Sequence, residues 1–149
     1  MQLQYLIADN RNRQDPWPMT FVNFDDHVNE RAMNHIELMN SGNCLVDRSS
    51  KNYLDLYDKD KIIYLSPDGE EELESVNGDE IFVIGGIVDR VVENNIPKKA
   101  SLEAATMDKV KCAKLPLDKY VKWKSGTKYL TLTAVVGILQ VLCFLVDLT

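Results

Sequence analysis

Residues 80–86, EIFVIGG, are the stretch that decides the fold. Four consecutive apolar residues of strand-favouring types end at a pair of glycines, which predicts a buried strand followed by a close approach of backbone or ligand. Similar strand patterns occur at residues 20–24, 61–65 and 111–115, whereas residues 25–40 and 98–107 favour helices. Short strands that alternate with helices are typical of βαβ units, so we predict an α/β fold with a mostly parallel sheet.

Turn and cap residues mark the ends of several of these elements. The aspartates at residues 25–26 can cap the helix that follows the first strand. Residues 66–69, SPDG, predict a turn after the second strand, and helix or turn is expected over residues 70–76. Thr131 or Thr133 can cap a last helix.

This last helix contains an apolar run of 13 residues, 134–146, interrupted by Gln140. Because the run falls short of the ~18–20 residues that a bilayer span requires, we expect a buried helix rather than a membrane segment. The 149 residues are 45% apolar and 27% charged, without an internal repeat or a low-complexity linker. This composition is typical of one ordinary globular domain, which we place over residues 1–149.

Cysteine and charge patterns narrow the classes of partner. Cys44, Cys112 and Cys143 are odd in number and widely spaced, with no CxxC pair and no nearby His, so neither a disulfide framework nor a metal site is expected. The net charge of −6 hides an asymmetry, because residues 98–128 hold nine Lys against three acidic residues. This lysine-rich stretch predicts either a specific basic face or an ordinary solvated helix surface.

Aromatic residues interleave with the lysines near the end of that stretch. Tyr120 and Trp123 alternate with Lys119, Lys122 and Lys124. Such a mixture of cations and rings is suited to RNA, whose phosphates attract lysine and whose bases stack on aromatic side chains. It is equally compatible with an amphipathic edge whose rings pack inward.

Three predicted strands end in loops that contain Gly or Pro, at residues 65–68, 85–89 and 115–118. Ligands of open α/β sheets bind beyond the carboxyl ends of the strands, so these loops can line one pocket. Neither a GxGxxG fingerprint nor a phosphate loop is present.

Asp89, just past a buried strand and two glycines, is the best candidate for a general base or a ligand-orienting carboxylate, or else it is a capping residue. No nucleophilic triad is indicated.

The order of four motifs resembles one enzyme family. The motifs are DPWPMTFVNF at 15–24, KIIYLSPDGEEELE at 61–74, FVIGGIVD at 82–89 and KCAKLPLDKYVKWKSGTKYLTL at 111–132. Together they resemble the SPOUT-type tRNA methyltransferases that modify N1 of purine 9, and the last motif is most similar to the mitochondrial branch, the methyltransferase subunit of animal mitochondrial ribonuclease P.

The resemblance implies a SPOUT-type α/β fold with a carboxyl-terminal trefoil knot that holds S-adenosylmethionine. Carried over by position, the cofactor-binding residues are Leu65, Gly85, Gly86, Ile87, Val88, Leu115, Pro116, Leu117, Lys128, Tyr129, Leu130 and Thr131. Asp89 matches the aspartate that is proposed to take the N1 proton of guanine. The residues expected to face tRNA are Arg11, Arg90, Lys119, Lys122 and Lys124. No metal is implied.

The resemblance also implies a place of action and partners. These are the mitochondrion, a short-chain dehydrogenase subunit and a protein-only ribonuclease P nuclease. The family's usual first strand and basic amino-terminal extension are not found in this sequence, so we expect a domain that is incomplete at both ends. Guanine and adenine both remain open as the substrate base. The alternative function is a non-catalytic domain, derived from the same fold, that binds tRNA or a protein.

Overall fold

The computed structural model describes residues 2–25, 46–85, 99–126 and 130–147, with side chains through residue 143. The chain divides into two compact units. The first comprises Met1–Leu56 and Thr131–Ile138, and the second comprises Tyr57–Leu130 and Leu139–Thr149. The helix expected over residues 25–40 lies outside the described residues except for its first position.

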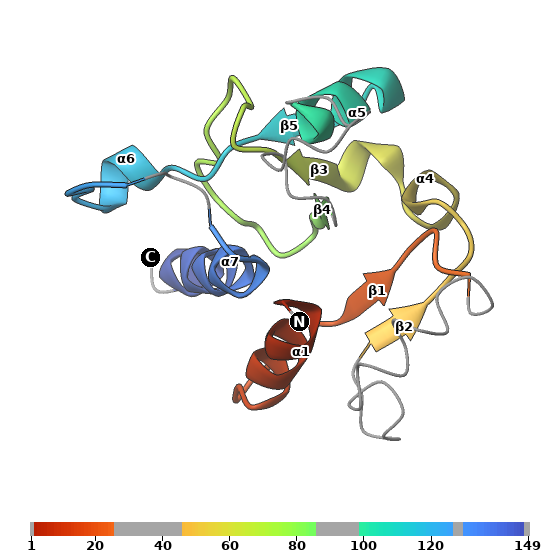
Figure 1. The fold of residues 1–149 in the computed structure, drawn as a ribbon, viewed down its shortest axis with the longest axis horizontal. Helices are drawn as coiled ribbons and strands as arrows, with labels where there is room; N and C mark the ends of the chain where they lie inside the picture. The colour runs from red at the N-terminus through yellow and green to blue at the C-terminus, as the bar shows by residue number, and fades with distance from the viewer. Residues whose placement is uncertain (1, 26–45, 86–98, 127–129, 148–149) are drawn as a thin grey trace. The chain divides into compact units, whose positions relative to one another are not determined.

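The first unit contains a two-stranded parallel sheet between short helices (Figure 1). Its elements are α1 (Gln2–Arg11), β1 (Met19–Phe21), β2 (Val46–Arg48) and α4 (Tyr53–Leu56). Met19 pairs with Val46, and Phe21 pairs with Arg48. The strand predicted over residues 20–24 is therefore shorter than expected. It ends because Asn23 adopts a left-handed conformation, with φ of 52°, which asparagine tolerates better than most residues.

The apolar centre of the first unit forms around Ile7 of α1. Leu3 packs against it from the same helix, while Phe21, Phe24 and Val46 pack against it from the sheet and the loop that follows β1. The rings of Phe21 and Phe24 lie 5.9 Å apart, centroid to centroid, in a tilted arrangement. This cluster buries the inner face of a small amphipathic helix against two strands, which neither element could cover alone.

The second unit contains a three-stranded parallel sheet with the order β4-β3-β5. Its elements are the 3-10 helix η1 (Lys59–Lys61), β3 (Ile62–Leu65), β4 (Ile81–Ile84), α5 (Ala100–Asp108), β5 (Lys111–Ala113) and α6 (Leu117–Tyr120). The predicted strands at 61–65, 80–84 and 111–115, the predicted helix at 98–107 and the parallel pairing are thus confirmed, with ends shifted by one or two residues.

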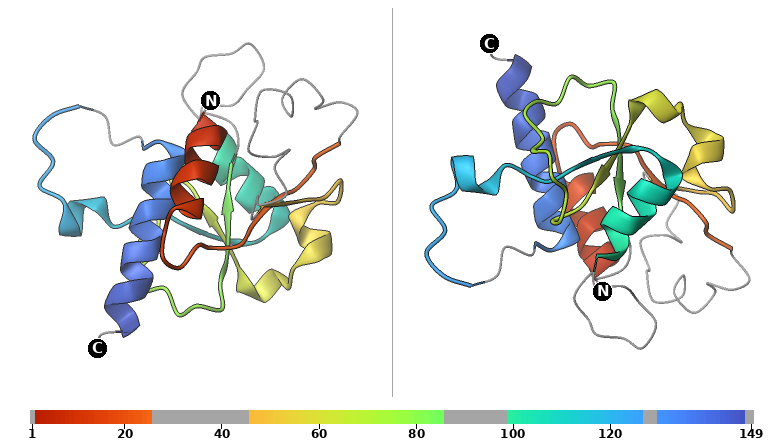
Figure 2. Two further views of the ribbon diagram at one scale, coloured as in Figure 1. Left: turned by 90° about the horizontal axis from the view of Figure 1, so that it is seen from below. Right: turned by 90° about the horizontal axis from the view of Figure 1, so that it is seen from above.

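The central strand β3 is buried at all four positions, and Ile62 is only 1% exposed. Such a continuous apolar run is typical of a parallel strand covered on both faces. Helix α5 lies against β3 and β5, as the two views of Figure 2 show. Ala105 of α5 and Ala113 of β5 are completely buried, and their small side chains permit close packing of helix and sheet.

Residues 70–76 do not form the helix that was one of the two expectations for this segment. The amide of Leu73 donates to the carbonyl of Lys114 at 2.9 Å, and the amide of Lys114 donates to the carbonyl of Glu71 at 2.9 Å. The i,i+3 spacing of Leu73 and Val76 imitates a helix, but both side chains are buried while the backbone hydrogen bonds run to the chain that follows β5. The turn expected at residues 66–69 is present.

The last helix, α7, spans Leu132–Asp147. Thr131 caps it, because the Ala134 amide donates to the Thr131 hydroxyl at 3.3 Å, whereas Thr133 lies inside the helix. Val136, Leu139 and Leu142 are buried at a spacing of three residues, which confirms a helix with one buried face. Within the described ranges, no helix combines the length and the apolar character needed to cross a membrane.

Candidate functional site

The carboxyl ends of β3, β4 and β5 meet at one edge of the sheet in the second unit. Leu65, the last residue of β3, pairs with Ile84 at the end of β4 and with Ala113 at the end of β5. Because all three strands are parallel, the chain segments that follow them leave from the same edge. The three loops predicted to line one pocket therefore begin side by side, while the pocket itself stays a prediction.

The turn after β3 is held tightly against β5. The amide of Ser66 donates to the carbonyl of Ala113 at 3.0 Å, and the amide of Gly69 closes the turn on the carbonyl of Ser66 at 3.2 Å. A Cβ atom on Gly69 would lie 3.0 Å from the carbonyl carbon of Ala113. The close approach of these two backbones therefore favours glycine at this position.

The loop after β5 begins with a tight turn at Pro116. The amide of Leu117 donates to the carbonyl of Leu115 at 2.8 Å, and Pro116 has φ of −78° and ψ of 57°. These angles and the hydrogen bond across one residue define an inverse γ-turn, for which the proline ring fixes φ in advance. Pro116 is buried, whereas Leu115 and Leu117 are half-buried on either side of it.

Two buried hydroxyl groups lie beside Gly85, the residue that follows β4. A Cβ atom at Gly85 would be 3.4 Å from the Ser101 hydroxyl oxygen and 3.5 Å from the Tyr64 hydroxyl oxygen. Ser101 is 7% exposed and Tyr64 is 8% exposed. Sequence reasoning did not single out these two residues. The sequence contained a signal for each of them. Tyr64 brings a hydroxyl group into the otherwise apolar strand IIYL, and Ser101 brings one to the start of a predicted helix.

The same edge contains a thiol that is unsuited to nucleophilic chemistry. Burial raises the pKa of Cys112 on β5, and the negative charge of Asp68 in the turn after β3 raises it further. The thiolate is the reactive form of cysteine, so a raised pKa keeps Cys112 in the protonated, less reactive thiol form. Within the described ranges, no three His, Cys, Asp or Glu residues come together in a way that could hold a metal ion.

The predicted cofactor residues are divided by what the structure describes. Leu65, Gly85, Leu115, Pro116 and Leu117 lie at or next to the shared carboxyl edge. Leu130 and Thr131 precede α7, and Thr131 belongs to the first unit. The predicted residues Gly86, Ile87, Val88, Asp89, Arg90, Lys128 and Tyr129 lie outside the described residues.

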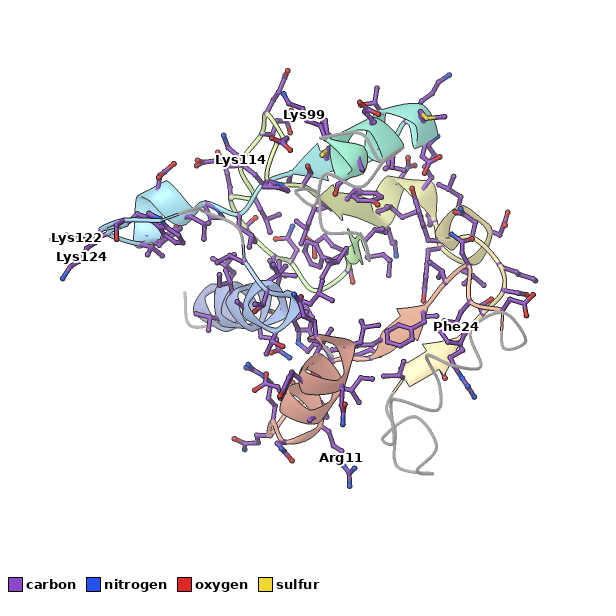
Figure 3. The ribbon with its side chains drawn as sticks, viewed as in Figure 1. Arg11, Phe24, Lys99, Lys114, Lys122 and Lys124 are labelled. Carbon is purple, nitrogen blue, oxygen red and sulfur yellow. The ribbon has the colours of Figure 1, made fainter. Side chains whose placement is uncertain are left out.

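Three of the predicted RNA-facing residues, Lys119, Lys122 and Lys124, lie in the described part of the second unit and are exposed. Lys119 ends close to Tyr120, with its ammonium nitrogen 5.2 Å from the ring centroid, and Tyr120 itself is 57% exposed. Lys122 and Lys124 lie at the outer end of the segment after α6 (Figure 3). Trp123 is half-buried. In the first unit, Arg11 is exposed at the end of α1 (Figure 3).

A family model described as tRNA (guanine(9)-N(1))-methyltransferase TRM10/TRM10A matches residues 1–147. The chain belongs to this family. The order of the four sequence motifs therefore indicated the correct family.

Individual relatives agree with this membership. The chain is 32% identical over 141 residues to the Mitochondrial ribonuclease P protein 1 homolog of Drosophila melanogaster, covering 93% of this chain and 31% of that protein. It is 34% identical over 133 residues to the tRNA methyltransferase 10 homolog C of Bos taurus, covering 87% and 30%. The chain thus spans about a third of the length of these curated relatives.

A solved structure from the same family has the same architecture. The full-length spTrm10 in complex with SAH superposes with a TM-score of 0.74 at 28% sequence identity, covering 94% of this chain and 72% of that one. The α/β fold with parallel strands is therefore that of the Trm10 family. The trefoil knot stays a prediction.

Proposed function

We propose that this chain is a methyltransferase domain that transfers a methyl group from S-adenosylmethionine to N1 of guanine or adenine at position 9 of tRNA. The observation that carries the proposal is the shared carboxyl edge of β3, β4 and β5, where three loops of the family's motifs begin in register. Family membership over residues 1–147 supports methyl transfer to N1 of guanine 9 as the reaction at that edge.

The described part of the edge fits an adenosine-type ligand. Half-buried Leu115 and Leu117 offer apolar surface to a flat base, while Gly85 leaves the backbone after β4 accessible. The nearby hydroxyls of Tyr64 and Ser101 add polar groups of the kind that bind a ribose. We propose that Gly86, Ile87, Val88, Lys128, Tyr129, Leu130 and Thr131 complete the cofactor site with Leu65 and Pro116. When bound, S-adenosylmethionine supplies an electrophilic methyl group.

The role proposed for Asp89 is that of general base. Guanine N1 carries a proton that must leave as the nitrogen lone pair attacks the methyl carbon, and a carboxylate within hydrogen-bond reach accepts it. Adenine N1 already has a free lone pair and depends less on this residue. The strand-end loops contribute by holding the nitrogen and the methyl group in line.

Calorimetric titration of the 149-residue chain with S-adenosylmethionine tests the cofactor site first. Saturable one-to-one binding supports the proposal. Absence of binding by a folded chain contradicts it and favours the alternative, a non-catalytic domain that binds tRNA or a protein. Methyl transfer to a tRNA transcript, read as a block to reverse transcription at position 9, then distinguishes guanine from adenine substrates.

Replacement of the proposed base tests the mechanism separately. Asp89→Asn is expected to slow guanine methylation about 10²–10⁴-fold while cofactor affinity is retained, because only proton acceptance is lost. Asp79→Asn, in the loop before β4, is the matched control and should leave the rate unchanged. An unaltered guanine rate in Asp89→Asn would show that another group accepts the proton.

We further propose a mitochondrial location, together with a short-chain dehydrogenase and a protein-only ribonuclease P nuclease as partners. The support is the name of the Drosophila relative, Mitochondrial ribonuclease P protein 1 homolog. Fractionation of cells that make the tagged natural protein, followed by its purification and mass spectrometry, tests both points. Recovery from another compartment, or without these two classes of partner, would contradict them.

A further inference from the structure

The segment that follows α6 carries two exposed lysines, Lys122 and Lys124, two positions apart. Val121 has φ of −120° and ψ of 122°, so the chain is extended as it leaves the helix. In an extended chain, alternate side chains point to the same side and are about 7 Å apart, two residues at ~3.4 Å each. Lys122 and Lys124 are two positions apart in the sequence and lie together at the outer end of the segment (Figure 3). A separation of about 7 Å is close to that of successive phosphates along a nucleic-acid strand.

Tyr120 presents an aromatic ring beside this lysine pair. It is 57% exposed, and the Lys119 ammonium lies 5.2 Å from its centroid. A cation near one region of the ring leaves other ring surface available for stacking. Among the described residues, neither Lys119 nor Lys122 nor Lys124 forms an ion pair with a carboxylate.

Local hydrogen bonds hold the segment in its shape. The Val121 amide donates to the Leu117 carbonyl at 2.8 Å and fixes the exit from α6. The Trp123 indole N–H donates to the Gly126 carbonyl at 3.2 Å and closes the chain after the lysines. These two hydrogen bonds restrain the backbone before any ligand arrives, which reduces the entropy cost of binding.

We infer that residues 119–124 bind an unpaired stretch of RNA, in which one base stacks on Tyr120 while Lys122 and Lys124 contact successive phosphates. This inference rests on the proposed function for the source of the RNA, which is tRNA. Residues 109–124 contain six Lys and one Asp on an otherwise acidic chain, so the positive charge is local. An exposed aromatic ring within such a patch favours RNA over an acidic protein as the ligand. Lysines alone can bind the negative charges of either ligand, but only RNA has bases that stack on the ring.

Fluorescence anisotropy with a labelled, unstructured oligouridylate tests the surface directly, and a tRNA transcript serves as a second probe. Tyr120→Leu is expected to weaken oligouridylate binding about 5- to 150-fold, the range for loss of one stacked base. Tyr120→Phe keeps the ring and should retain affinity. The double replacement of Lys122 and Lys124 by Gln should reduce the slope of log affinity against log salt by about 1.4, or two single-strand phosphates.

A matched control pair exists in the same unit. Lys59 and Lys61 are exposed, have the same spacing in sequence and lie in η1 between acidic residues. Their double replacement by Gln removes the same charge and should leave the salt slope unchanged. An equal loss in both pairs would overturn the inference by showing that only net charge matters. A 5-iodouridine probe irradiated in the complex should crosslink at Tyr120, and crosslinks confined to other residues would also overturn it.

The outcome of these RNA-binding tests can be distinguished from the outcome of the tests of the proposed function. Cofactor titration of each variant should match that of the unaltered chain, since Tyr120, Lys122 and Lys124 lie outside the proposed cofactor site. Binding of S-adenosylmethionine together with Tyr120-independent RNA binding would overturn this inference and leave the methyltransferase proposal intact. Polyglutamate binding with the same dependence on Tyr120 would assign the surface to an acidic protein instead.

Discussion

At Gly69 a methyl group would be crowded, since a Cβ atom would lie 3.0 Å from the Ala113 carbonyl carbon and 3.1 Å from the Lys114 amide nitrogen. Both atoms belong to backbone and cannot swing aside as the end of a side chain can. We expect Gly69→Ala to lower the free energy of unfolding by about 1–3 kcal/mol, the usual cost of overpacking. Urea unfolding measures this loss.

Gly137 in α7 is the matched control for this substitution. A Cβ atom there would meet only the Arg13 guanidinium, at 3.3 Å, and this group is the flexible end of a side chain. Because alanine favours a helix interior over glycine, Gly137→Ala should raise the free energy of unfolding by about 0.5–1 kcal/mol. Equal effects of the two substitutions would contradict the steric explanation for Gly69.

Cys112 provides a prediction about pH. Burial and the charge of Asp68 raise the pKa of this thiol, so the native state holds the proton more tightly than the unfolded chain does. The corresponding stabilisation is present below the unfolded thiol's pKa and is lost as the pH rises through the native value. Asp68→Asn should shift the pH profile of Cys112 alkylation by iodoacetamide to lower pH.

Mass spectrometry of the alkylated peptide gives the rate for Cys112 alone. Glu70→Gln is the control, because Glu70 is exposed in the same region but is not a cause of the raised pKa. A profile that moves equally in both variants would show that Asp68 has no specific effect on the thiol.

The candidate site could be predicted from sequence where glycine and proline mark backbone turns. Pro116 and Gly85 were indicated by residue type, and the structure places both next to the same strand ends. Tyr64 and Ser101 were not predicted as site residues. A single hydroxyl group in an apolar stretch forms no repeating pattern, so the sequence does not show which other residue lies beside it. Their proximity at Gly85 depends on how α5 packs on the sheet, which is a tertiary property.

At the scale of elements, the start of α7 depends on Thr131. Its hydroxyl accepts a hydrogen bond from the Ala134 amide, one of the four amides that a helix leaves without an internal partner. Thr131→Ala should lower the free energy of unfolding by about 1 kcal/mol, while Thr131→Ser keeps the acceptor and should cost much less. Thermal unfolding of both variants measures the difference, and equal losses would contradict the cap.

Elements with strong local signals were predictable, whereas β2 and α4 were not. Runs of apolar, β-favouring residues predicted β3 and β4, and α5 was predicted within two residues. By contrast, β2 and α4 have only three and four residues, too few for a periodicity to appear. The helix considered for residues 70–76 failed because pairing with the chain after β5 outweighed a local i,i+3 pattern.

At the scale of the whole molecule, ligand binding should appear as stability. A ligand that binds only the native state at 100 times its Kd adds about 2.7 kcal/mol to the free energy of unfolding. S-adenosylhomocysteine should therefore raise the melting temperature of the second unit by several degrees, in proportion to the logarithm of its concentration. Homocysteine alone lacks the adenosine and should have no effect. Equal shifts with both compounds would contradict an adenosine site at the strand ends.

The strand order β4-β3-β5 also determines when the sheet can form during translation. The ribosome releases β3 before either neighbour exists, and β5 emerges only after β4, the loop that follows it and α5. Until Lys111–Ala113 has been made, four apolar side chains and one hydrogen-bonding edge of β3 stay open to other chains. We expect the nascent protein to need chaperones most during that interval, because its central strand is complete before its sheet can close.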